Sequence, residues 1–220
     1  MSEIPSIDDF RAVFLKYTEK AFRLLPKIAN PNILDIGCGT GVCTIKLASL
    51  TDGIIIGMDI DEVALNSLND KIRRAGLFNQ IITIHGSLLN SGFEKESFDI
   101  IWAEGVLHII GYKKGFKACY ELLKPEGYLV IAEAIDKITR KKSLIPKSGF
   151  ELYNQVIWEK GCWWKEYYSP LEEILDRLRK EGVPINLFSE LIKHENEIAM
   201  VKGDISQTDT AHYILKKIER

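Results

Sequence analysis

The segment from Ile33 to Gly41 constrains the fold more than any other part of the chain. It reads Ile-Leu-Asp-Ile-Gly-Cys-Gly-Thr-Gly, a short apolar run that enters three glycines spaced two apart. Apolar side chains then recur with helical spacing at Val42, Ile45, Leu47, Ala48 and Leu50. Glycines permit a sharp turn and a close approach by a ligand. A strand, a glycine turn and a helix in this order therefore predict a nucleotide-cofactor site.

The spacing of the glycines favours a nucleoside ligand over a dinucleotide. Dinucleotide folds use Gly-x-Gly-x-x-Gly to seat a pyrophosphate at a helix N-terminus. Here the third glycine comes one residue early, and Val42 stands where that pattern needs its last glycine. Asp35, just upstream, would repel a pyrophosphate and attract an ammonium group. We expect a zwitterionic nucleoside, and the glycine register argues against an NAD-dependent oxidoreductase.

The composition indicates one domain with a full core, because 46% of the 220 residues are hydrophobic. The net charge is −2, and the densest basic run, residues 137–142, is typical of a solvated helix face, which disfavours a nucleic-acid partner. The N-terminus lacks the pattern of a signal peptide, and no apolar stretch reaches the roughly 18 residues of a membrane span. The four cysteines contain no Cys-x-x-Cys pair. Free thiols, no metal site, no membrane partner and a cytoplasmic location are expected.

Strands alternate with helices through the first two thirds of the chain. Ser6 is expected to cap a helix over residues 7–25, and Pro31 opens the first strand. Further strands are predicted at residues 53–59, 80–85, 98–102 and 128–132, with helices at 62–75 and 113–123 between them. Such alternation predicts a right-handed, mostly parallel sheet with helices on both faces. The strands are apolar throughout, which is typical of a sheet buried on both sides.

The last third is less regular. Residues 150–158 are a candidate sixth strand, and residues 170–181 form a helix with leucines on one face. We expect helical structure over residues 185–202 and a final strand at 212–218.

Four segments together resemble the class I S-adenosylmethionine-dependent methyltransferases. Asp-Ile-Gly-Cys-Gly-Thr-Gly resembles the first motif of that family, and Gly-Met-Asp-Ile-Asp (residues 57–61) resembles the second. Residues 97–102 and 122–131 resemble the fourth strand and the turn into the fifth. The resemblance spans about residues 30 to 134 and depends on the order and spacing of all four segments.

The resemblance implies an α/β doubly wound sheet of seven strands, mostly parallel, with an antiparallel last strand. It divides a single methyltransferase domain, residues 1–220, into four parts. These are an N-terminal helical cap (1–30), a Rossmann-like core (31–159), a helical and aromatic insertion (160–208) and the final strand (209–220).

The resemblance also assigns cofactor contacts. Asp35 would accept a hydrogen bond from the amino group of S-adenosylmethionine, Asp59 would hold both ribose hydroxyls, and Ile60 would flank the adenine. The alternatives are that Asp35 only stabilises the turn, Asp59 only caps a helix and Ile60 lies in the core. The full set of predicted cofactor residues is Asp35, Gly37, Cys38, Gly39, Gly41, Asp59, Ile60, Ser87, Leu88 and Glu104.

Two of these residues, Ser87 and Cys38, need separate interpretation. After the third strand the family often has an acid that accepts from the adenine amino group. Here Gly86 is followed by Ser87, so a hydroxyl or a backbone amide must serve there. Cys38 is interpreted as a small side chain at the turn and not as a nucleophile.

Glu104 and His108 are the predicted catalytic residues. They stand four residues apart just beyond the fourth strand and would point to one side if this stretch were helical. Glu104 would lie near the sulfonium, and His108 would act as a base or contact the substrate. In the alternative, Glu104 caps the next segment and His108 packs against the fold.

An aromatic cluster follows the sixth strand. Trp163, Trp164, Tyr167 and Tyr168 are predicted lid or substrate residues, because this connection reaches over the pocket mouth in the family. Tyr17, on the first helix, is a further predicted lid residue. A satellite core beneath the insertion is the alternative.

The predicted function is S-adenosylmethionine-dependent methylation of a small molecule by a monomer or homodimer. The rivals are an RNA or protein methyltransferase, and a non-catalytic S-adenosylmethionine-binding subunit that scaffolds a partner. No Asn-Pro-Pro-Tyr or Asp-Pro-Pro-Tyr motif is present, which argues against methylation of adenine or of a glutamine amide. The sequence names neither the acceptor nor the atom that is methylated.

Overall fold

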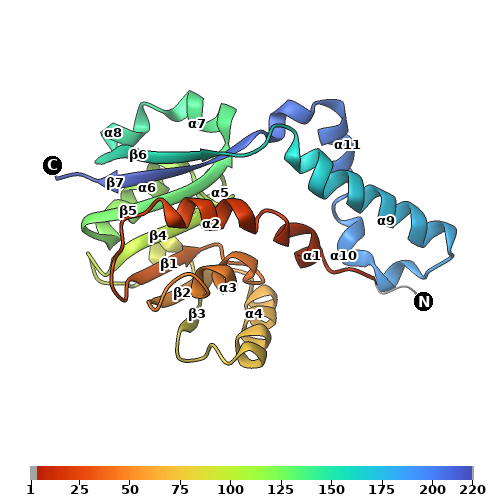
Figure 1. Cartoon of the computed structure of the whole chain (residues 1–220), viewed down its shortest axis with the longest axis horizontal. Coiled ribbons are helices and arrows are strands. Elements are labelled where there is room, and N and C mark those ends of the chain that lie inside the picture. The colour runs from red at the N-terminus through yellow and green to blue at the C-terminus, as the bar shows by residue number, and fades with distance from the viewer. Residues whose placement is uncertain (1–3, 220) are drawn as a thin grey trace.

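A seven-stranded sheet forms the centre of the protein (Figure 1). The computed structural model describes residues 4–219, so residues 1–3 of the predicted cap and residue 220 of the predicted final strand lie outside it. The strand order is β3-β2-β1-β4-β5-β7-β6. The strands are β1 (Asn32–Ile36), β2 (Ile54–Asp59), β3 (Ile81–His85), β4 (Phe98–Glu104), β5 (Leu123–Ala134), β6 (Phe150–Ile157) and β7 (Thr210–Lys217).

The pairing confirms the predicted fold class. Strand β1 pairs in parallel with β2 and β4, whereas β7 runs antiparallel to both β5 and β6. The chain order reverses between β1 and β4, because β2 and β3 extend the sheet one way and β4 and β5 the other. In open α/β sheets a ligand binds at the carboxyl ends of the strands beside such a switch point. We call the edge where β1, β2, β4 and β5 end the carboxyl edge.

Helices cover both faces of the sheet. One face packs against α2 (Leu15–Arg23), α3 (Val42–Ala48) and α4 (Glu62–Ala75). The other face packs against α5 (Leu107–Ile110), α6 (Tyr112–Leu122), α7 (Ile135–Lys141) and α8 (Leu144–Lys147). Fully buried apolar side chains fill both layers, which is why the strand sequences show no alternation of polar and apolar residues.

A helical lobe stands beside the sheet at its carboxyl edge (Figure 1). It consists of a π-helical turn at residues 164–168 and of α9 (Ser169–Lys180), α10 (Ser189–Ile192) and α11 (Glu195–Gly203). Its apolar core is separate from the two sheet layers and includes residues of the N-terminal α1 (Ile7–Ala12). The helix predicted over residues 185–202 is thus two short helices preceded by a 3₁₀ turn at Ile185–Leu187.

The single helix predicted over residues 7–25 is wrong in one respect. Ser6 caps it as expected, with its hydroxyl accepting from the backbone of Asp9, but the chain breaks after Ala12 and α2 begins at Leu15. The ring of Phe14 at the break lies 5.0 Å from that of Trp158 and 4.4 Å from that of Trp163. Packing between distant segments sets this break, and apolar periodicity, which continues across it, cannot reveal it.

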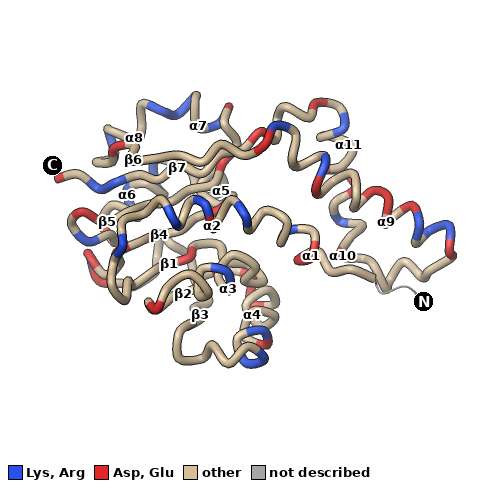
Figure 2. Tube along the Cα trace, viewed as in Figure 1, with Lys and Arg blue, Asp and Glu red and all other residues tan. Residues whose placement is uncertain are grey.

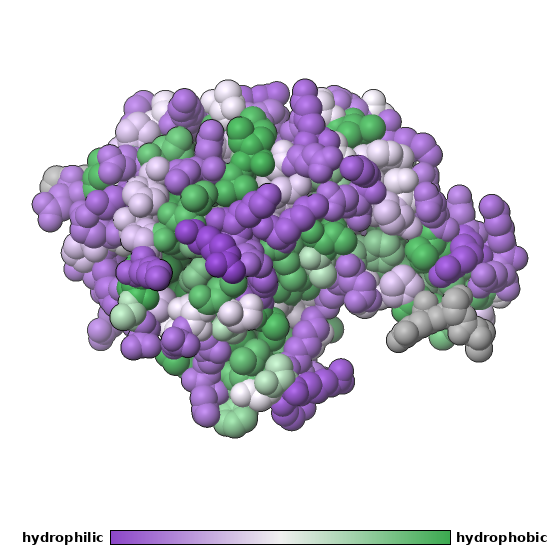
Figure 3. Space-filling view, in the orientation of Figure 1, coloured by the Kyte–Doolittle hydropathy of each residue, from purple (hydrophilic) through white to green (hydrophobic). Residues whose placement is uncertain are grey.

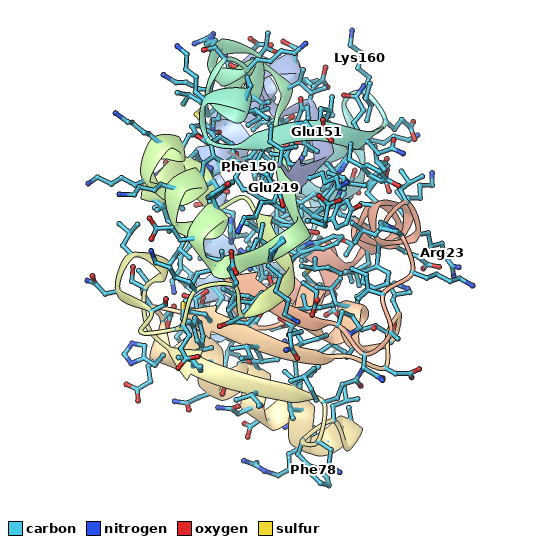
Figure 4. All side chains as sticks on the ribbon, turned by 90° about the vertical axis from the view of Figure 1, so that its left-hand side faces the viewer. Arg23, Phe78, Phe150, Glu151, Lys160 and Glu219 are labelled. Atoms are coloured by element: carbon cyan, nitrogen blue, oxygen red, sulfur yellow. The ribbon has the colours of Figure 1, made fainter. Side chains whose placement is uncertain are left out.

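The opposite edge of the sheet carries the start of β6 and the end of the chain. In the view from that side, Phe150, Glu151 and Glu219 are drawn near one another (Figure 4), and Figure 1 shows the C-terminus at the opposite end of the molecule from the helical lobe. Phe150 pairs with Lys217 in the register of β6 and β7. Among residues 4–219, none of the helices has the length and apolarity to cross a membrane.

The cap of α4 offers a test of this part of the fold. Asp61 accepts hydrogen bonds from the backbone N–H groups of Val63 and Ala64, at 2.9 and 3.1 Å. Asp61→Ala should lower the free energy of unfolding by about 1 kcal/mol, because two N–H groups lose their partner. Asp70→Ala, which removes an exposed ion pair with Arg73, is the control and should cost less than about 0.5 kcal/mol. Equal losses in urea unfolding would contradict the capping role.

Candidate functional site

The glycine turn leaves one of its three glycines open to the outside. Gly37, Gly39 and Gly41 all have positive φ, at +67°, +53° and +85°. A Cβ added at Gly37 would lie 2.8 Å from Val106, and one at Gly41 would lie 2.1 Å from Leu68. A Cβ at Gly39 would meet no protein atom within 4 Å. The outer glycines therefore fit the turn against its neighbours, and the middle one faces free space.

Asp59 ties this turn to the end of β2. Its Oδ2 accepts from the N–H of Gly39 at 2.7 Å, and its Oδ1 accepts from the N–H of Asp61 at 2.9 Å. The next residue, Ile60, is 71% exposed, which excludes the alternative that it lies in the core. Thus a carboxylate and an exposed apolar side chain stand beside the open glycine.

The other predicted cofactor residues differ in access. Cys38 and Leu88 are buried, and Leu88 packs into the layer of the sheet beneath α5 and α6. Ser87 is half-buried at the end of β3. Cys38 and Leu88 would therefore contact a ligand mainly through their backbone atoms. Ser87 has the more accessible side chain.

Asp35 lies beneath the turn, with 2% of its surface exposed. Its Oδ2 accepts a hydrogen bond of 2.6 Å from the hydroxyl of Thr44 on α3. Burial, together with the charges of Glu104 and Asp59, raises the pKa of Asp35 to about 7, although the Thr44 hydrogen bond acts in the opposite direction. This contact gives Asp35 the turn-stabilising role of the alternative interpretation, and its predicted contact with a cofactor stays a prediction.

Glu104 ends β4 and collects donors from four elements. Its Oε1 accepts from Trp102 Nε1 at 2.7 Å, from Thr18 Oγ1 at 2.9 Å and from His212 Nε2 at 2.9 Å, and the Cys43 thiol lies 3.5 Å away. Burial acts to raise the pKa of Glu104, but the hydrogen bonds from His212, Trp102 and Thr18 outweigh it and hold the pKa below its usual range. The side chain is 26% exposed, and its Oε2 has no partner among residues 4–219. An ionised oxygen is thus left to face a ligand.

The hydrogen bonds of His212 determine its tautomer. The imidazole is fully buried, its Nε2 donates to Glu104, and its Nδ1 accepts from the indole N–H of Trp158 at 3.0 Å. A second ring proton would point at the Trp158 donor, so the ring is neutral with its proton on Nε2. No local pattern around His212 indicated that it anchors Glu104.

Glu104 and His108 do not share a helix, contrary to the predicted arrangement. Gly105, with a φ of +66°, separates the end of β4 from α5, which begins at Leu107. Glu104 pairs with Ala132 across the strands, and Glu133, the next residue, bonds to His108 at 3.1 Å. Successive strand residues point to opposite faces. Glu104 therefore lies on the face covered by α2 and α3. Glu133 lies on the other face, where it meets His108 of α5.

The predicted lid residues pack together at the carboxyl edge. Tyr167 and Tyr168 are buried, Trp163 and Trp164 are half-buried, and Trp163 donates to the hydroxyl of Thr210 at 3.0 Å. The rings of Tyr17 and Trp158 stack with centroids 4.6 Å apart. The cluster has the burial of the satellite core given as the alternative, and its position over the site keeps a lid role as a prediction.

A second link joins α1 to the glycine turn. Asp8 bonds to the hydroxyl of Thr40 within the turn and to the ammonium of Lys71 on α4, and Lys71 also donates to the Thr40 carbonyl at 2.7 Å. Figure 3 shows the surface hollowed below α1, between α4 and the helical lobe. Helix α1 therefore roofs the turn, which no local pattern around Asp8 indicated.

Comparison with known proteins identifies the family. Residues 33–127 match the family model described as a methyltransferase domain. The 27-O-demethylrifamycin SV methyltransferase of Amycolatopsis mediterranei (strain S699) is 26% identical over 119 residues, which are 54% of this chain and 44% of that protein. The demethylmenaquinone methyltransferase of Lactobacillus johnsonii is 31% identical over 140 residues, 62% of this chain and 56% of that protein. The chain thus spans about half the length of these relatives.

The match and these relatives support a class I S-adenosylmethionine-dependent methyltransferase. This confirms the family predicted from the four motifs, and S-adenosylmethionine is the cofactor of that family. The fold agrees with that of phosphoethanolamine N-methyltransferase 2 of Haemonchus contortus, solved with S-adenosyl-L-methionine. The TM-score is 0.67 at 16% identity, over 98% of this chain and 61% of that one.

The glycine turn of this chain fits such a cofactor. Asp59 and Glu104 end β2 and β4, and Asp35 is the last residue but one of β1, which lies between them. The charges of Asp59 and Glu104 help to raise the pKa of Asp35. A cationic ligand relieves that repulsion, and the open face of Gly39 gives it room. The sulfonium and ammonium groups of S-adenosylmethionine meet both conditions.

The raised pKa of Asp35 predicts a pH-dependent stability. A carboxyl whose pKa is higher in the folded than in the unfolded state favours folding at low pH and loses that contribution as the pH rises toward 7. Asp35→Asn retains an acceptor for Thr44 and does not ionise. Without ligand, its stability relative to wild type should therefore improve from pH 5 to pH 8, by on the order of 2 to 4 kcal/mol.

Thermal unfolding of both proteins at the two pH values measures this effect. Asp52→Asn, on the exposed turn before β2, is the control and should show the same difference from wild type at both. A constant difference for Asp35→Asn as well would show that Asp35 is already ionised at pH 5.

Proposed function

We propose that this protein transfers a methyl group from S-adenosylmethionine to a small-molecule acceptor. One observation carries the proposal: an open glycine turn at the switch point of the sheet is surrounded by carboxylates, of which Glu104 keeps an unpartnered, ionised oxygen. Such a site suits a nucleoside that carries cationic groups, and it does not suit a negatively charged pyrophosphate. The family membership supports the same cofactor.

Three residues have distinct roles in this proposal. Gly39 allows the cofactor to approach the backbone without a clash. Asp59 would hold the ribose hydroxyls, by exchanging its present backbone donors for them in part. Glu104 would offer Oε2 to a cationic group, while its four donors on Oε1 prevent the carboxylate from turning away.

The protein itself needs to contribute little to the making and breaking of bonds. The cofactor supplies a methyl group on an already activated sulfur. The protein has to hold the acceptor in line with that methyl and keep water out. Helix α1 and the aromatic cluster around Trp158 and Trp163 roof the carboxyl edge, and we propose that they exclude water there.

A small acceptor agrees with the charge and with the relatives. The two relatives compared above are named for demethylrifamycin and demethylmenaquinone, which are small molecules. The Lys and Arg residues of α7 and α8 lie along the top of the sheet and lead away from its carboxyl edge (Figure 2). They are therefore not gathered at the mouth of the site, as an RNA substrate would favour.

Cofactor binding is the first test. S-adenosylhomocysteine at about 100 times its dissociation constant should add roughly 2.7 kcal/mol of stability, or about 5 to 10 °C in melting temperature, and NAD should add none. Asp59→Ala should weaken binding by about 10- to 150-fold, because two charge-assisted hydrogen bonds are lost.

A matched control is available at the opposite edge of the sheet. Asp99 also accepts a backbone N–H, from Asn32 at 2.8 Å, and pairs with Lys124. Asp99→Ala should lower stability but leave the calorimetric affinity for S-adenosylhomocysteine unchanged. No thermal shift with millimolar S-adenosylhomocysteine would refute the proposed function, and normal affinity in Asp59→Ala would remove that residue from the site.

A further inference from the structure

A second carboxylate–histidine pair lies at the carboxyl edge, on the other face of the sheet from Glu104. Glu133, near the end of β5, is 3% exposed. Its Oε1 and Oε2 lie 3.2 and 3.1 Å from Nδ1 of His108, and its Oε1 also accepts from the backbone N–H of His108 at 3.2 Å.

This contact orients the imidazole and fixes its tautomer. A carboxylate can only accept, so the neutral ring carries its proton on Nδ1 and presents the lone pair of Nε2 outward. His108 is 35% exposed, and its Nε2 has no partner in the described part of the chain. A buried carboxylate behind an accessible imidazole is the arrangement that keeps a histidine ready to take up a proton.

A buried hydroxyl lies beside the pair. Tyr112, at the start of α6, is 9% exposed. Burial, then the negative charge of Glu133 and the contact with its carboxylate, raise the pKa of Tyr112, so this hydroxyl keeps its proton at neutral pH.

The pair is close to the glycine turn. The side chain of Val106 lies against Gly37, where an added Cβ would come within 2.8 Å of it. Val106 directly precedes α5, and His108 is in its first turn. The N–H of Gly105 also bonds to the carbonyl of Ala132, next to Glu133, at 2.9 Å. Short contacts thus connect the turn, His108 and Glu133.

We propose that Glu133 is a positioning residue that holds His108 as the base for the methyl acceptor, and that the acceptor reacts through a hydroxyl group. This inference rests on the proposed methyl transfer. A base is needed only when the attacking atom carries a proton that it must lose at neutral pH. A site for an acceptor without such a proton has no use for an oriented imidazole.

The atoms balance without a further reactant. The hydroxyl oxygen forms a bond to the methyl carbon as the carbon–sulfur bond breaks, and the electron pair of that bond stays on sulfur. The hydroxyl proton passes to Nε2 of His108, which later releases it to water. Glu133 stabilises the imidazolium formed in between without being protonated itself.

The surroundings favour a phenol or enol over a sugar-like alcohol. Ile109, next to His108, is 75% exposed, and Leu89, in the turn after β3, is 44% exposed. Ile109 thus leaves apolar surface next to the base, and the turn that holds Leu89 contacts α6. Phenols and enols combine an apolar body with a hydroxyl that a histidine can deprotonate.

The tautomer can be measured without knowing the natural acceptor. Long-range ¹H–¹⁵N spectra of the imidazole nitrogens at pH 8 should show His108 protonated on Nδ1 and His212 protonated on Nε2, so that each residue is a reference for the other. Glu133→Met removes the acceptor at similar volume, and His108 should then revert to the Nε2–H form that free imidazole side chains prefer in water. Glu133→Gln, which keeps a carbonyl acceptor, should restore the Nδ1–H form at least in part.

Turnover tests the role of the pair in the reaction. Methyl transfer from radiolabelled S-adenosylmethionine is measured with catechol and 1-naphthol, and with pyridine as a nucleophile that has no proton to lose. Transfer to a phenol should fall about 100-fold or more in His108→Gln and about tenfold or more in Glu133→Met, mainly in kcat. The affinity for S-adenosylhomocysteine should not change in either variant.

The matched control is the exposed pair of His194 and Glu197 in the helical lobe, whose Nδ1 and Oε2 lie 3.0 Å apart. Glu197→Gln should leave the His108 signals and turnover as in wild type. Three results would overturn the inference: a proton on Nε2 of wild-type His108, transfer to pyridine alone, or no transfer to either phenol. Each of these with normal S-adenosylhomocysteine binding leaves the proposed function standing, whereas absent binding refutes the proposed function itself.

Discussion

The carboxylate of Glu104 joins more of this molecule than any other polar group in the site. Its Oε1 accepts from α2, from β4 and from β7, and a thiol of α3 approaches it. Through His212 it is linked to Trp158, whose ring stacks on Tyr17 and lies near Phe14. One charged group thus connects the sheet, two helices of the adjoining layer (α2 and α3) and the aromatic roof. Loss of this carboxylate would leave a buried imidazole, indole and hydroxyl without their common acceptor.

Burying several carboxylates at one edge has a cost, and the chain offsets it unevenly. Glu104 is stabilised as an anion by its donors, and Asp59 holds two backbone N–H groups. Asp35 has one hydroxyl donor in an apolar layer, and its pKa rises accordingly. A bound cation would compensate for this repulsion more effectively than further donors could. The binding of the cofactor and the stability of the strand ends are therefore coupled.

Local sequence predicted the parts of this structure that depend on local physics. The glycine spacing, the apolar strands, the cap at Ser6 and the helix over residues 62–75 each depend on residues close together in the chain, and the structure has them where they were expected. The break at Phe14 and the split of the helix over 185–202 depend on packing between distant segments. For the same reason the sequence indicated Glu104 and His108 but not their partners, His212 and Glu133, which lie 108 and 25 residues away along the chain. A signal was present in Glu133, an acid near the end of an otherwise apolar strand.

The two carboxylate–histidine pairs at the carboxyl edge, Glu104 with His212 and Glu133 with His108, differ in their contacts. His212 is fully buried, and both of its ring nitrogens have hydrogen-bond partners. A change of tautomer would therefore break a hydrogen bond. His108 has one nitrogen held by Glu133 and the other open to the site. In the first pair the imidazole serves the carboxylate, because it helps to keep Glu104 ionised and fixed. In the second pair the carboxylate orients the imidazole. In the proposed reaction, Glu104 would hold a cationic group on one face of the sheet and His108 would take up a proton on the other. Such an arrangement suits an in-line displacement at a sulfonium methyl, because the acceptor and the leaving sulfur lie on opposite sides of the carbon that is transferred.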